Sequence, residues 1–452
     1  MTGTALVYGL ALAGDALAAQ LARRGWKLVI ADDAATDAKR ELAAAFGSPL
    51  IEAPTAARIA ELVAAADMVC PAPGVAETHA VVLAALAAGT PLRTEIDLAY
   101  EWEQQRFGGP RPMLAVTGTD GKTTTTLLTA HILEAAGHRV AAVGNTEVPL
   151  AAALDADVDV FVVECSSFRL NWLQSFRAEA SVWLNLAPDH QNWHTSMAAY
   201  EAAKARMWAH RWPTDVAIGW ADDAVVMANL RAAGGPTRTF ALAGADYRVE
   251  EGNLIGPAGV IAAVSGMTRT LPHDLTNALA AAALVLEAGL AAPVDVQHAL
   301  ATFRHPPHRI EPLGTIDGVQ WFNDSKATSP HAALTAIRAF DNIVLLAGGL
   351  NKGLDLASLA SEHARVKAVV GLGTAAAEVT VPFQPYCPTR IATSMAQAVQ
   401  FADEFAEAGD VVLLSPACAS FDWYPAGGYP ARGDDFKQLV RALSTRVRST
   451  HR

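Results

Sequence analysis

The sequence predicts an α/β protein of three domains, and three observations support this prediction. Short apolar runs typical of buried strands alternate with longer segments typical of helices along most of the 452 residues. One apolar run leads through a glycine-rich turn directly into a helical pattern, within residues 113–129. The length matches about three average domains. We therefore expect three α/β domains that span residues 1–98, 99–305 and 306–452, separated by polar, Pro- and Gly-containing linkers.

Composition and charge exclude several classes of protein. A hydrophobic content of 52% with 18% charged residues is typical of a globular chain rather than a disordered one. The net charge of -12 and the lack of a basic stripe argue against a nucleic-acid partner. The four cysteines are scattered without a C-x-x-C pair, which favours reduced thiols over disulfides or a zinc site.

The amino-terminal stretch lacks a basic segment and carries Asp15 within its apolar run, so we expect no signal peptide. No uncharged apolar run is long enough to span a bilayer. We expect a cytoplasmic, monomeric protein without a membrane partner.

The first domain begins with a strand, a helix and a second strand, at residues 4–9, 15–25 and 27–33. This order is typical of the start of a Rossmann-like domain. The second strand ends in Asp32 and Asp33, where such domains hold a ribose-binding carboxylate. The turn after the first strand keeps Gly9 and Gly14 of the dinucleotide fingerprint, but Ala11 occupies its middle position. An ordinary α/β turn is therefore at least as well supported as dinucleotide binding.

The second domain opens with the strongest motif in the chain. The apolar residues 113–116 predict a buried strand, and the pattern G-x-x-G-K-T follows at once. Gly118 and Gly121 allow a tight turn, and Lys122 and Thr123 open a helix whose N–H groups can bind phosphate. A lysine neutralises outer phosphates and a threonine hydroxyl suits Mg²⁺. A surface turn is the alternative, but the strand before it and the helix after it favour a nucleoside triphosphate site.

Polar residues also follow later strands of this domain. Glu164 ends an apolar strand, and Asp189 and His190 follow another, so we expect them at the same edge of a parallel sheet as the phosphate loop. Such carboxylates hold Mg²⁺ in α/β nucleotide enzymes. Lys204 lies in a helix rich in alanine and aromatic residues, and spacing alone predicts a solvated surface lysine there. Residues 252–259 predict a hairpin, and residues 271–290 predict a helix with Asn277 near its start.

The third domain contains four apolar strands, each followed by a Gly- or Ser-rich loop, which predicts a second open parallel sheet. Several loop residues together indicate a ligand crevice at the strand ends: Asp324, Lys326, Thr328, Lys352 and Ser420.

Three motifs in order, T-G-T-D-G-K-T-T-T, N-D-S-K-A-T and L-S-P-A-C-A-S-F-D, identify a family. Over essentially its whole length the chain resembles the Mur ligases of peptidoglycan synthesis, and most closely the members that add D-glutamate to UDP-N-acetylmuramoyl-L-alanine. The resemblance implies an amide ligase that uses ATP and Mg²⁺ and forms an acyl phosphate. It assigns the UDP-substrate to the first domain, ATP to the second and the amino acid to the third.

The resemblance also assigns roles to individual residues. The implied catalytic residues are Lys122, Glu164, His190 and Lys204. The implied metal ligands are Thr123, Glu164, His190 and Lys204, the last if it is carbamylated. The implied ATP-binding residues are Gly118, Thr119, Asp120, Gly121, Lys122, Thr123, Thr124, Asn277, Arg309 and Asp324. The implied UDP-substrate residues are Leu12, Ala13, Asp33, Gly74, Asn145 and Ser166. The implied amino-acid residues are Lys326, Thr328, Lys352, Ser420, Phe421 and Tyr429.

The sequence departs from the family pattern at several positions. Ala11 replaces a glycine, Ala34 stands where an arginine often contacts uridine, and Arg169 stands where glutamine is common. The segment after Ser420 is two residues longer than usual and carries extra aromatic residues.

Three alternatives stay open, and the departures near Ser420 support the first of them. A ligase of this kind that adds L-glutamate or another amino acid is the first. A nucleotide-binding subunit without ligase activity is the second, which the set Glu164, His190 and Lys204 disfavours. A nicotinamide-dependent oxidoreductase is the third, which Ala11 disfavours.

Overall fold

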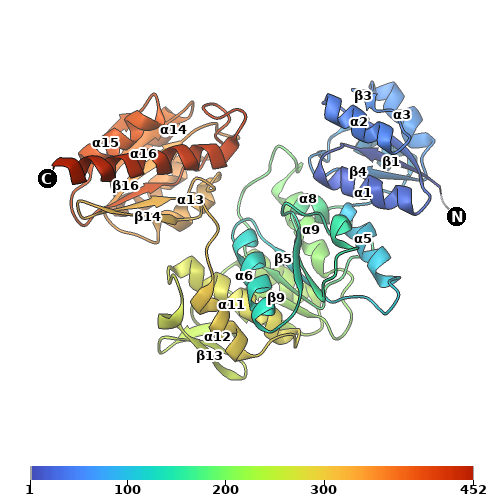
Figure 1. Ribbon diagram of the computed structural model, residues 1–452, viewed down its shortest axis with the longest axis horizontal. Helices are drawn as coiled ribbons and strands as arrows, with labels where there is room; N and C mark the ends of the chain where they lie inside the picture. Colours follow the sequence, from blue (N-terminus) through green and yellow to red (C-terminus); the bar gives the residue numbers. More distant parts are fainter. Residues whose placement is uncertain (1–2, 451–452) are drawn as a thin grey trace. The chain divides into compact units, whose positions relative to one another are not determined.

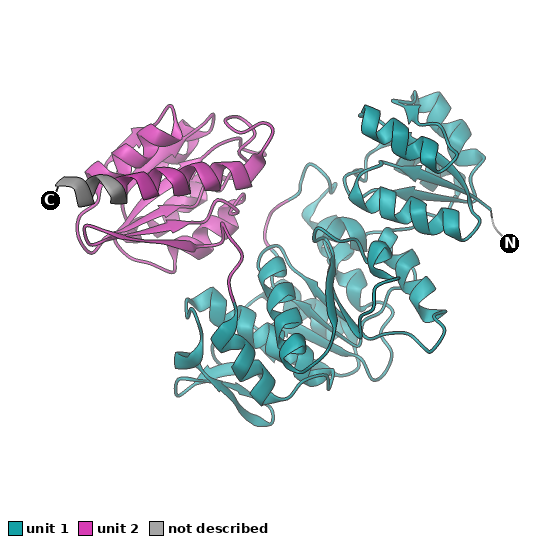
Figure 2. Cartoon of the chain, in the orientation of Figure 1, with its two compact units in different colours: residues 1–186, 190–303 teal, residues 187–189, 304–452 magenta. Residues whose placement is uncertain are grey.

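The structure is a computed structural model that describes residues 3–450, with side chains described as far as residue 443. Parallel sheets covered by helices form most of the chain, which confirms the predicted α/β fold class (Figure 1). The chain divides into two compact units (Figure 2). Unit 1 contains the residues up to 186 together with 190–303, and unit 2 contains 187–189 and 304 onward.

The amino-terminal part of unit 1 is a four-stranded parallel sheet with the strand order β3-β2-β1-β4. Alternate residues of β1 enter two different hydrophobic clusters, so the sheet is covered by helices on both faces. The strands are β1 Thr4–Tyr8, β2 Lys27–Asp32, β3 Ile51–Glu52 and β4 Met68–Pro71. The helices are α1 Leu12–Arg23, α2 Asp37–Ala45, α3 Ala56–Ala64, α4 Ala80–Ala88 and α5 Glu95–Gln104.

The incomplete fingerprint of this sheet has a steric explanation. Gly9 has a φ of +94°, and a Cβ added at Gly14 would lie only 2.0 Å from the Gly9 oxygen. Both glycines are therefore needed for the strand-to-helix turn itself. Ala11 precedes the first turn of α1 with a φ of -109°, a conformation that any residue can adopt. The two retained glycines build the turn, and only the middle position is free to vary.

The central sheet of unit 1 has the order β10-β9-β8-β5-β7-β6, and all of its strands are parallel. Residues of β5 alternate between two buried clusters, so this sheet is also covered on both faces. The strands are β5 Met113–Thr117, β6 Val140–Gly144, β7 Val160–Glu164, β8 Ala180–Trp183, β9 Val216–Trp220 and β10 Thr237–Phe240. The helices between them are α6 Lys122–Ala135, α7 Leu150–Ala153, α8 Ser167–Leu170, α9 Met197–Ala205, η1 Arg206–Trp208 and α10 Ala224–Ala233.

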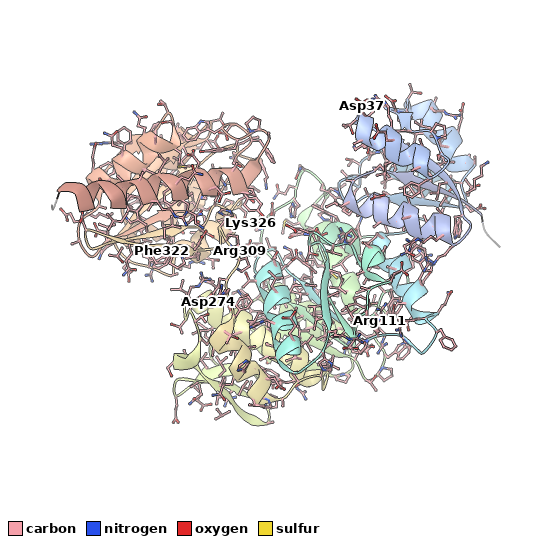
Figure 3. The ribbon with its side chains drawn as sticks, in the orientation of Figure 1. Asp37, Arg111, Asp274, Arg309, Phe322 and Lys326 are labelled. Atoms are coloured by element: carbon pink, nitrogen blue, oxygen red, sulfur yellow. The ribbon has the colours of Figure 1, made fainter. Side chains whose placement is uncertain are left out.

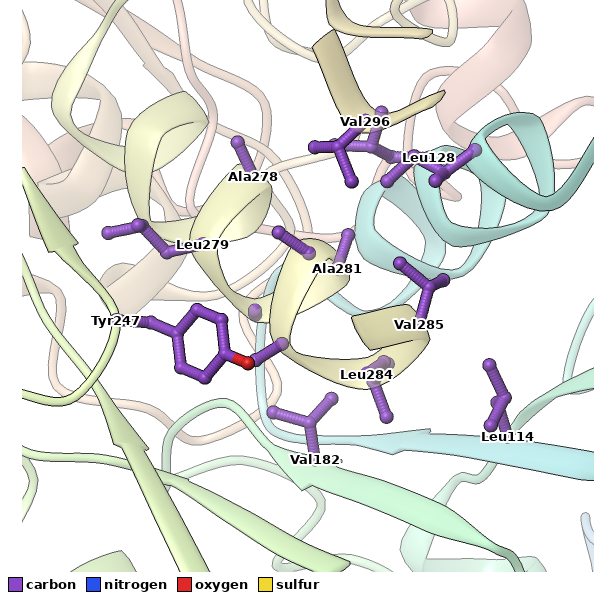
Figure 4. Close-up of a cluster of buried hydrophobic side chains, with 14 of the residues drawn as sticks. Leu114, Leu128, Val182, Tyr247, Ala278, Leu279, Ala281, Leu284, Val285 and Val296 are labelled. Carbon is purple, nitrogen blue, oxygen red and sulfur yellow. The ribbon is translucent and has the colours of Figure 1, made fainter. Parts of the chain in front are cut away.

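A small antiparallel sheet and two helices complete unit 1. The predicted hairpin is confirmed as β12 and β13, which pair antiparallel beside β11. The Ala-rich helix α11 is buried between the hairpin, α6 and the central sheet (Figure 4). The elements are β11 Arg248–Glu250, β12 Asn253–Gly256, β13 Gly259–Ala263, η2 Val264–Gly266, α11 Pro272–Glu287 and α12 Pro293–Thr302.

Unit 2 contains one sheet with the order β14-β15-β19-β16-β17-β18. The prediction of a purely parallel sheet was wrong at one edge, because β14 runs antiparallel to β15 and was not anticipated. Pro312 and Gly314 obscure this strand in the sequence, and the register shifts between them, as is common on an edge strand. The strands are β14 Glu311–Ile316, β15 Val319–Asn323, β16 Ile343–Gly348, β17 Val366–Leu372, β18 Thr389–Ile391 and β19 Val411–Leu414. The helices are α13 Pro330–Ile337, η3 Leu356–Arg365, α14 Ala376–Phe383, α15 Met395–Phe405 and α16 Gly428–Thr450.

The predicted boundary after residue 98 lies inside the continuous helix α5, whereas unit 2 begins at residue 304, two residues before the predicted start of the third domain. The division of unit 1 into two functional domains stays a prediction. Within the described residues, no helix is long and apolar enough to cross a membrane.

Candidate active site

The glycine-rich loop of residues 118–121 joins β5 to α6 at the centre of the central sheet. Gly118 and Gly121 have φ values of +156° and +82°. A Cβ at Gly118 would lie 2.9 Å from the Leu184 Cβ, and one at Gly121 would lie 2.8 Å from the Asn277 Oδ1. The loop therefore packs too closely for side chains at these positions. Asn277 also accepts a hydrogen bond from the Thr125 hydroxyl (3.2 Å), which ties α11 to α6 beneath the loop.

Asn185, which sequence reasoning missed, holds this loop in shape. Its Oδ1 accepts hydrogen bonds from the backbone N–H groups of Thr119 (2.9 Å) and Asp120 (2.8 Å), and its Nδ2 donates to the Asp120 oxygen (3.2 Å). Asn185 lies two residues after the end of β8, so a polar residue just past a strand beside β5 was the signal that could have revealed it.

Lys122 and Thr123 form the first turn of α6, as predicted. The Lys122 Nζ donates to the backbone oxygens of Gly118 (2.9 Å) and Thr119 (2.8 Å), so the ammonium group lies against the loop rather than in bulk solvent. The loop thus combines a helix N-terminus, close-packed glycines and a cation, which is the arrangement that binds phosphate groups.

Glu164 ends β7, the neighbour of β5 in the parallel sheet, so its carboxylate lies at the same edge as the phosphate loop. The residue is 1% exposed. Its Oε1 accepts a hydrogen bond from the Asn145 Nδ2 (3.0 Å), while its Oε2 has no hydrogen-bond partner among the described residues. A buried carboxylate oxygen without a donor is costly unless a cation binds it.

The Glu164 carboxylate, whose Oε2 has no hydrogen-bond partner among the described residues, fits a Mg²⁺ site. No group of three or more His, Cys, Asp or Glu side chains within the described residues could hold a metal alone. Mg²⁺ is commonly held by one or two carboxylates together with substrate phosphates and water, so the single free oxygen of Glu164 suits a metal that arrives with a nucleotide.

Lys204 is buried, which corrects the expectation from spacing that it lies solvated on a helix surface. Its side chain is among the largest that are fully buried, and its Nζ donates to the Gly118 oxygen (2.7 Å). The Nζ also lies 4.7 Å from the ring centroid of Tyr200, whose hydroxyl is 3.1 Å from the Thr119 Oγ1. The tertiary structure thus brings α9 against the phosphate loop, and Lys204 becomes part of the site.

His190 lies in the loop between β8 and α9 with a left-handed φ of +56°. Its ring makes an edge contact with Phe168, at 4.7 Å between centroids, and lies 6.1 Å from the Tyr200 ring. A strained backbone that is held by packed neighbours is often found at functional sites. His190, Glu164 and Lys204 therefore all belong to elements around β5.

The predicted UDP-substrate residues of the first sheet lie at the carboxyl ends of its strands. Leu12 is 66% exposed, Ala13 is buried and Gly74 is exposed. Asp33 accepts hydrogen bonds from the Tyr8 hydroxyl (2.6 Å) and the His79 Nε2 (2.9 Å). The Val81 N–H donates to the Nδ1 of the same histidine (3.2 Å), which assigns the ring proton to Nε2.

Arg169 does not face solvent, although arginine is unusual at this position in the family. It is 6% exposed and forms an ion pair with Glu95, whose Oε1 accepts a hydrogen bond from the Ala151 N–H (2.6 Å). Burial raises the pKa of Glu95, and Arg169 opposes that shift. Arg169, which lies in α8, therefore forms a buried ion pair with Glu95. Ser166, at the start of α8, is buried and its hydroxyl has no hydrogen-bond partner within the described residues.

Unit 2 carries the remaining predicted residues around the ends of β15 and β19. Asp324 accepts hydrogen bonds from the Ser415 hydroxyl (2.8 Å) and the Ile310 N–H (3.2 Å). The Lys326 Nζ lies 3.9 Å from the ring centroid of Tyr429. Figure 3 labels Lys326 and Arg309. Ser420 is 2% exposed, and its hydroxyl has no hydrogen-bond partner in the described part of the chain. The other members are more accessible: Thr328 is half-buried, Lys352 is exposed and Phe421 is 57% exposed.

Arg432, also missed from the sequence, organises this part of unit 2. Its guanidinium group donates to the Ser325 hydroxyl (2.9 Å), the Ser325 oxygen (2.7 Å) and the Cys418 oxygen (3.1 Å). Burial lowers its pKa to about 10. One buried cation thus joins the loop after β15 to the loop after β19, which carry most of the predicted amino-acid residues.

Comparison with known proteins agrees with this geometry. Residues 116–285 match the family model of the Mur ligase middle domain, and residues 308–418 match that of the Mur ligase glutamate ligase domain. The chain is 39% identical to the UDP-N-acetylmuramoylalanine–D-glutamate ligase of Frankia casuarinae, over 97% of this chain and 93% of that protein. It is 37% identical to the Myxococcus xanthus protein of the same name, over 97% and 98% of the two chains.

Solved structures show the same fold at low sequence identity. MurF ligase from Thermotoga maritima, solved in complex with ADP, matches with a TM-score of 0.61 at 15% identity, over 98% of this chain and 96% of that one. UDP-N-acetylmuramate-alanine ligase MurC from the same organism matches with a TM-score of 0.59 at 15% identity, over 98% and 100%. With the phosphate loop, the buried Glu164 and these relatives together, the chain belongs to the Mur ligase family.

Proposed function

We propose that this protein joins D-glutamate to UDP-N-acetylmuramoyl-L-alanine in an ATP-dependent ligation during peptidoglycan precursor synthesis. Curated relatives of 35–39% identity over most of the chain carry the name of this activity. The observation on the molecule that carries the proposal is Glu164, on the strand beside the phosphate loop, a buried carboxylate with one oxygen that has no hydrogen-bond partner among the described residues. This is the group that a ligase needs for a metal-bound triphosphate.

The chemistry follows from the two leaving groups involved. A carboxylate is a poor acyl donor until one of its oxygens becomes a good leaving group, so the substrate carboxylate attacks the γ-phosphate and displaces ADP. The amine of glutamate then attacks the resulting acyl phosphate and displaces inorganic phosphate through a tetrahedral intermediate. The enzyme contributes in-line positioning and charge neutralisation. In this proposal Lys122 and the loop N–H groups bind the phosphates, and Asn145 contacts the muramyl substrate.

Glu164, His190 and Thr123 would hold Mg²⁺, which supplies charge stabilisation for the transferring phosphoryl group. Lys204 would join them after carbamylation, which converts its ammonium group into an anionic carbamate. Its position supports this assignment, because the buried Nζ lies against the phosphate loop. Incubation with isotopically labelled bicarbonate should give a carbamate NMR signal that is lost in Lys204→Arg; a signal that persists in the variant would refute the assignment.

The residues of unit 2 complete the proposed substrate set. Asp324 and Arg309, together with Asn277 of unit 1, would bind the nucleotide, while Lys326, Thr328, Lys352, Ser420, Phe421 and Tyr429 would bind the amino acid. The free, buried hydroxyl of Ser420 supports a ligand there, since a polar group of this kind usually has a partner.

The direct test is phosphate release from the purified protein with ATP, Mg²⁺ and UDP-N-acetylmuramoyl-L-alanine, in parallel with D-glutamate, L-glutamate or no amino acid. Release that depends on D-glutamate supports the proposal in full. Release that depends on L-glutamate would support the proposed mechanism and show that the specificity assigned to the amino-acid pocket is wrong. No release in any reaction would favour a nucleotide-binding subunit without ligase activity.

The L-glutamate alternative rests on a specific feature. The segment after Ser420 carries Phe421, Trp423 and Tyr424. Phe421 is exposed and the Tyr424 hydroxyl donates to Asp435 (2.5 Å), so these rings alter the surface beside the predicted pocket. Stereochemistry is therefore the part of the proposal that the experiment tests most sharply.

A further inference from the structure

Three side chains of unit 1 form a buried hydrogen-bonded chain that none of the assignments above uses. The Glu77 Oε1 lies 2.8 Å from the His194 Nδ1, and the His194 Nε2 lies 2.8 Å from the Ser167 Oγ. The imidazole is 1% exposed, the Glu77 side chain is 14% exposed and Ser167 is buried. We refer to Glu77, His194 and Ser167 as the relay.

The protonation state of the relay follows from its surroundings. Burial lowers the pKa of His194, although Glu77 opposes the shift, so the surroundings favour the neutral ring. A neutral imidazole carries one N–H, and the carboxylate of Glu77 can only accept. Nδ1 therefore donates to Glu77, and Nε2 accepts a hydrogen bond from the Ser167 hydroxyl. All polar atoms of the imidazole are satisfied, so the ring is held in one orientation.

The relay joins three segments that are far apart in the sequence. Glu77 lies in the loop between β4 and α4, which also carries Gly74 of the predicted UDP-substrate site. His194 lies in the loop between β8 and α9, which carries His190. Ser167 is the first residue of α8, directly after the strand that ends in Glu164.

Further contacts between the first two loops reinforce the connection. The Trp193 Nε1 donates to the Pro73 oxygen (2.9 Å), and the Thr195 N–H donates to the Glu77 Oε2 (3.1 Å). The backbone N–H groups of Trp193 and His194 both donate to the His190 oxygen (2.9 and 3.0 Å), so the residues that contact the first sheet also fix the His190 turn.

We propose that Glu77 and His194 are positioning residues that couple the UDP-substrate loop of the first sheet to the catalytic loop bearing His190. The inference rests on the proposed function for its kinetic consequence, but the connection itself is independent of it. Ser167 and the aromatic contacts of Phe168 with His190 and Trp193 extend the same connection to the end of β7. The phosphate loop is held mainly by Asn185 and meets the relay through Tyr200, whose ring lies 5.1 Å from that of His194 and whose hydroxyl lies 3.1 Å from the Thr119 Oγ1.

The kinetic test is Glu77→Ala, with Glu41→Ala as a matched control that removes an exposed carboxylate from the same sheet's helices. We expect the KM for the UDP-substrate to rise about tenfold and kcat to fall, because a buried charge-assisted hydrogen bond is lost, while the KM for ATP stays unchanged. An equal rise in both KM values would overturn the proposal, because it would indicate a general loss of structure.

Two variants of His194 distinguish the hydrogen bond to Glu77 from the hydrogen bond to Ser167. His194→Asn can place its amide nitrogen near the position of Nδ1 and keep the hydrogen bond to Glu77, whereas His194→Leu keeps the bulk and loses both bonds. We expect the UDP-substrate KM of the Asn variant to stay within about threefold of the wild type, since the bond between the loops is retained. Equal defects in both variants would count against the coupling.

Amide hydrogen exchange provides a readout that needs no activity. In Glu77→Ala, residues 190–196 should exchange faster than in the wild type, while α6 exchanges at the same rate. Unchanged exchange in residues 190–196 would refute the relay. If the wild type binds or turns over no UDP-substrate but the exchange result holds, the proposed function fails and the connection between the loops stands.

Discussion

Glu164 presents a conflict between stability and function that can be measured at a single residue. Its buried Oε2 lacks a donor among the described residues, so the folded state carries the cost of an unsatisfied carboxylate oxygen. A bound cation would remove that cost. We therefore expect Glu164 to contribute more to the reaction rate than to the stability of the fold.

Glu164→Gln should lower the rate of phosphate release by on the order of a hundredfold or more, because a ligand to the metal is lost. The Gln Oε1 can still accept the bond from Asn145, so thermal stability without nucleotide should be equal to the wild type or higher. The neighbouring exposed Glu147→Gln is the control and should change neither quantity. A Glu164 variant that is less stable yet fully active would contradict this assignment.

Sequence reasoning succeeded at residues whose neighbours along the chain define them and failed at residues defined by contacts. Glu164 was found because it ends an apolar strand. Asn185 and Arg432 were missed, since their roles come from hydrogen bonds to loops about 65 and 107 residues away along the chain. Lys204 was identified only by resemblance, because its burial arises from the packing of α9 against the phosphate loop.

At the scale of elements, helix α6 is flanked by two glycines, Gly121 and Gly137, that share a left-handed backbone but differ in their surroundings. Gly121 combines a left-handed φ with a close neighbour, the Asn277 Oδ1. Gly137, which ends the same helix region, has a similar φ of +91° but has nothing within 4 Å of an added Cβ. Substitutions at Gly121 and Gly137 therefore distinguish the cost of a left-handed backbone from the cost of a steric clash.

Gly137→Ala should cost about 1 kcal/mol of unfolding free energy, the usual penalty for alanine in the left-handed region. Gly121→Ala should cost more, about 2–3 kcal/mol, and should also raise the KM for ATP, because the loop must move away from Asn277. Denaturant unfolding and ATP titration measure the two effects. Equal stabilities for the two variants would show that the contact with Asn277 does not constrain the loop.

Helix α5 links the first and central sheets through buried charges. Glu95, Asp97 and Glu103 are all buried on this helix and pair with Arg169, Arg93 and Arg111. The predicted domain boundary falls in this helix because its sequence looks polar and linker-like. Arg93 and Arg111 are near neighbours of their partners along the chain, but only the tertiary structure brings Arg169 to Glu95, 74 residues away.

Arg169→Gln should destabilise the protein by about 3 kcal/mol, since it leaves Glu95 buried without its counter-charge. The pKa of Glu95 is already raised by burial and should rise further in the variant. Because the pKa of the Glu95 carboxyl group in the folded state is above its ordinary value of 4.5, the protein loses stability as the pH rises past 4.5. The destabilisation should therefore grow from acidic to neutral pH.

The double variant Glu95→Gln, Arg169→Gln should recover most of this loss and remove the pH dependence. Denaturant unfolding across pH measures both effects. A loss that is the same at every pH would indicate that packing, rather than charge, explains the role of Arg169.

At the scale of the whole molecule, the proposed substrates require groups from both compact units. The phosphate loop and Glu164 belong to unit 1, whereas Asp324, Lys326 and Ser420 belong to unit 2. Units of this kind commonly close around their ligands by a hinge motion.

A non-hydrolysable ATP analogue together with the UDP-substrate should therefore reduce the radius of gyration in small-angle X-ray scattering. The UDP-substrate alone should have little effect, because its predicted residues all lie in unit 1. Scattering curves that do not change with both ligands would refute ligand-driven closure.

The sequence by itself determined the α/β class, the hairpin, the phosphate loop and the carboxylate that ends β7, because these depend on periodicity and on short-range backbone constraints. The tertiary structure decided the antiparallel edge strand β14, the burial of Lys204 and Arg169, and the relay from Glu77 to Ser167. Apart from β14, which pairs with the next strand along the chain, each of these depends on which distant segments meet and on the hydrogen bonds and ion pairs that form between those segments. Local sequence patterns contain no record of such pairings.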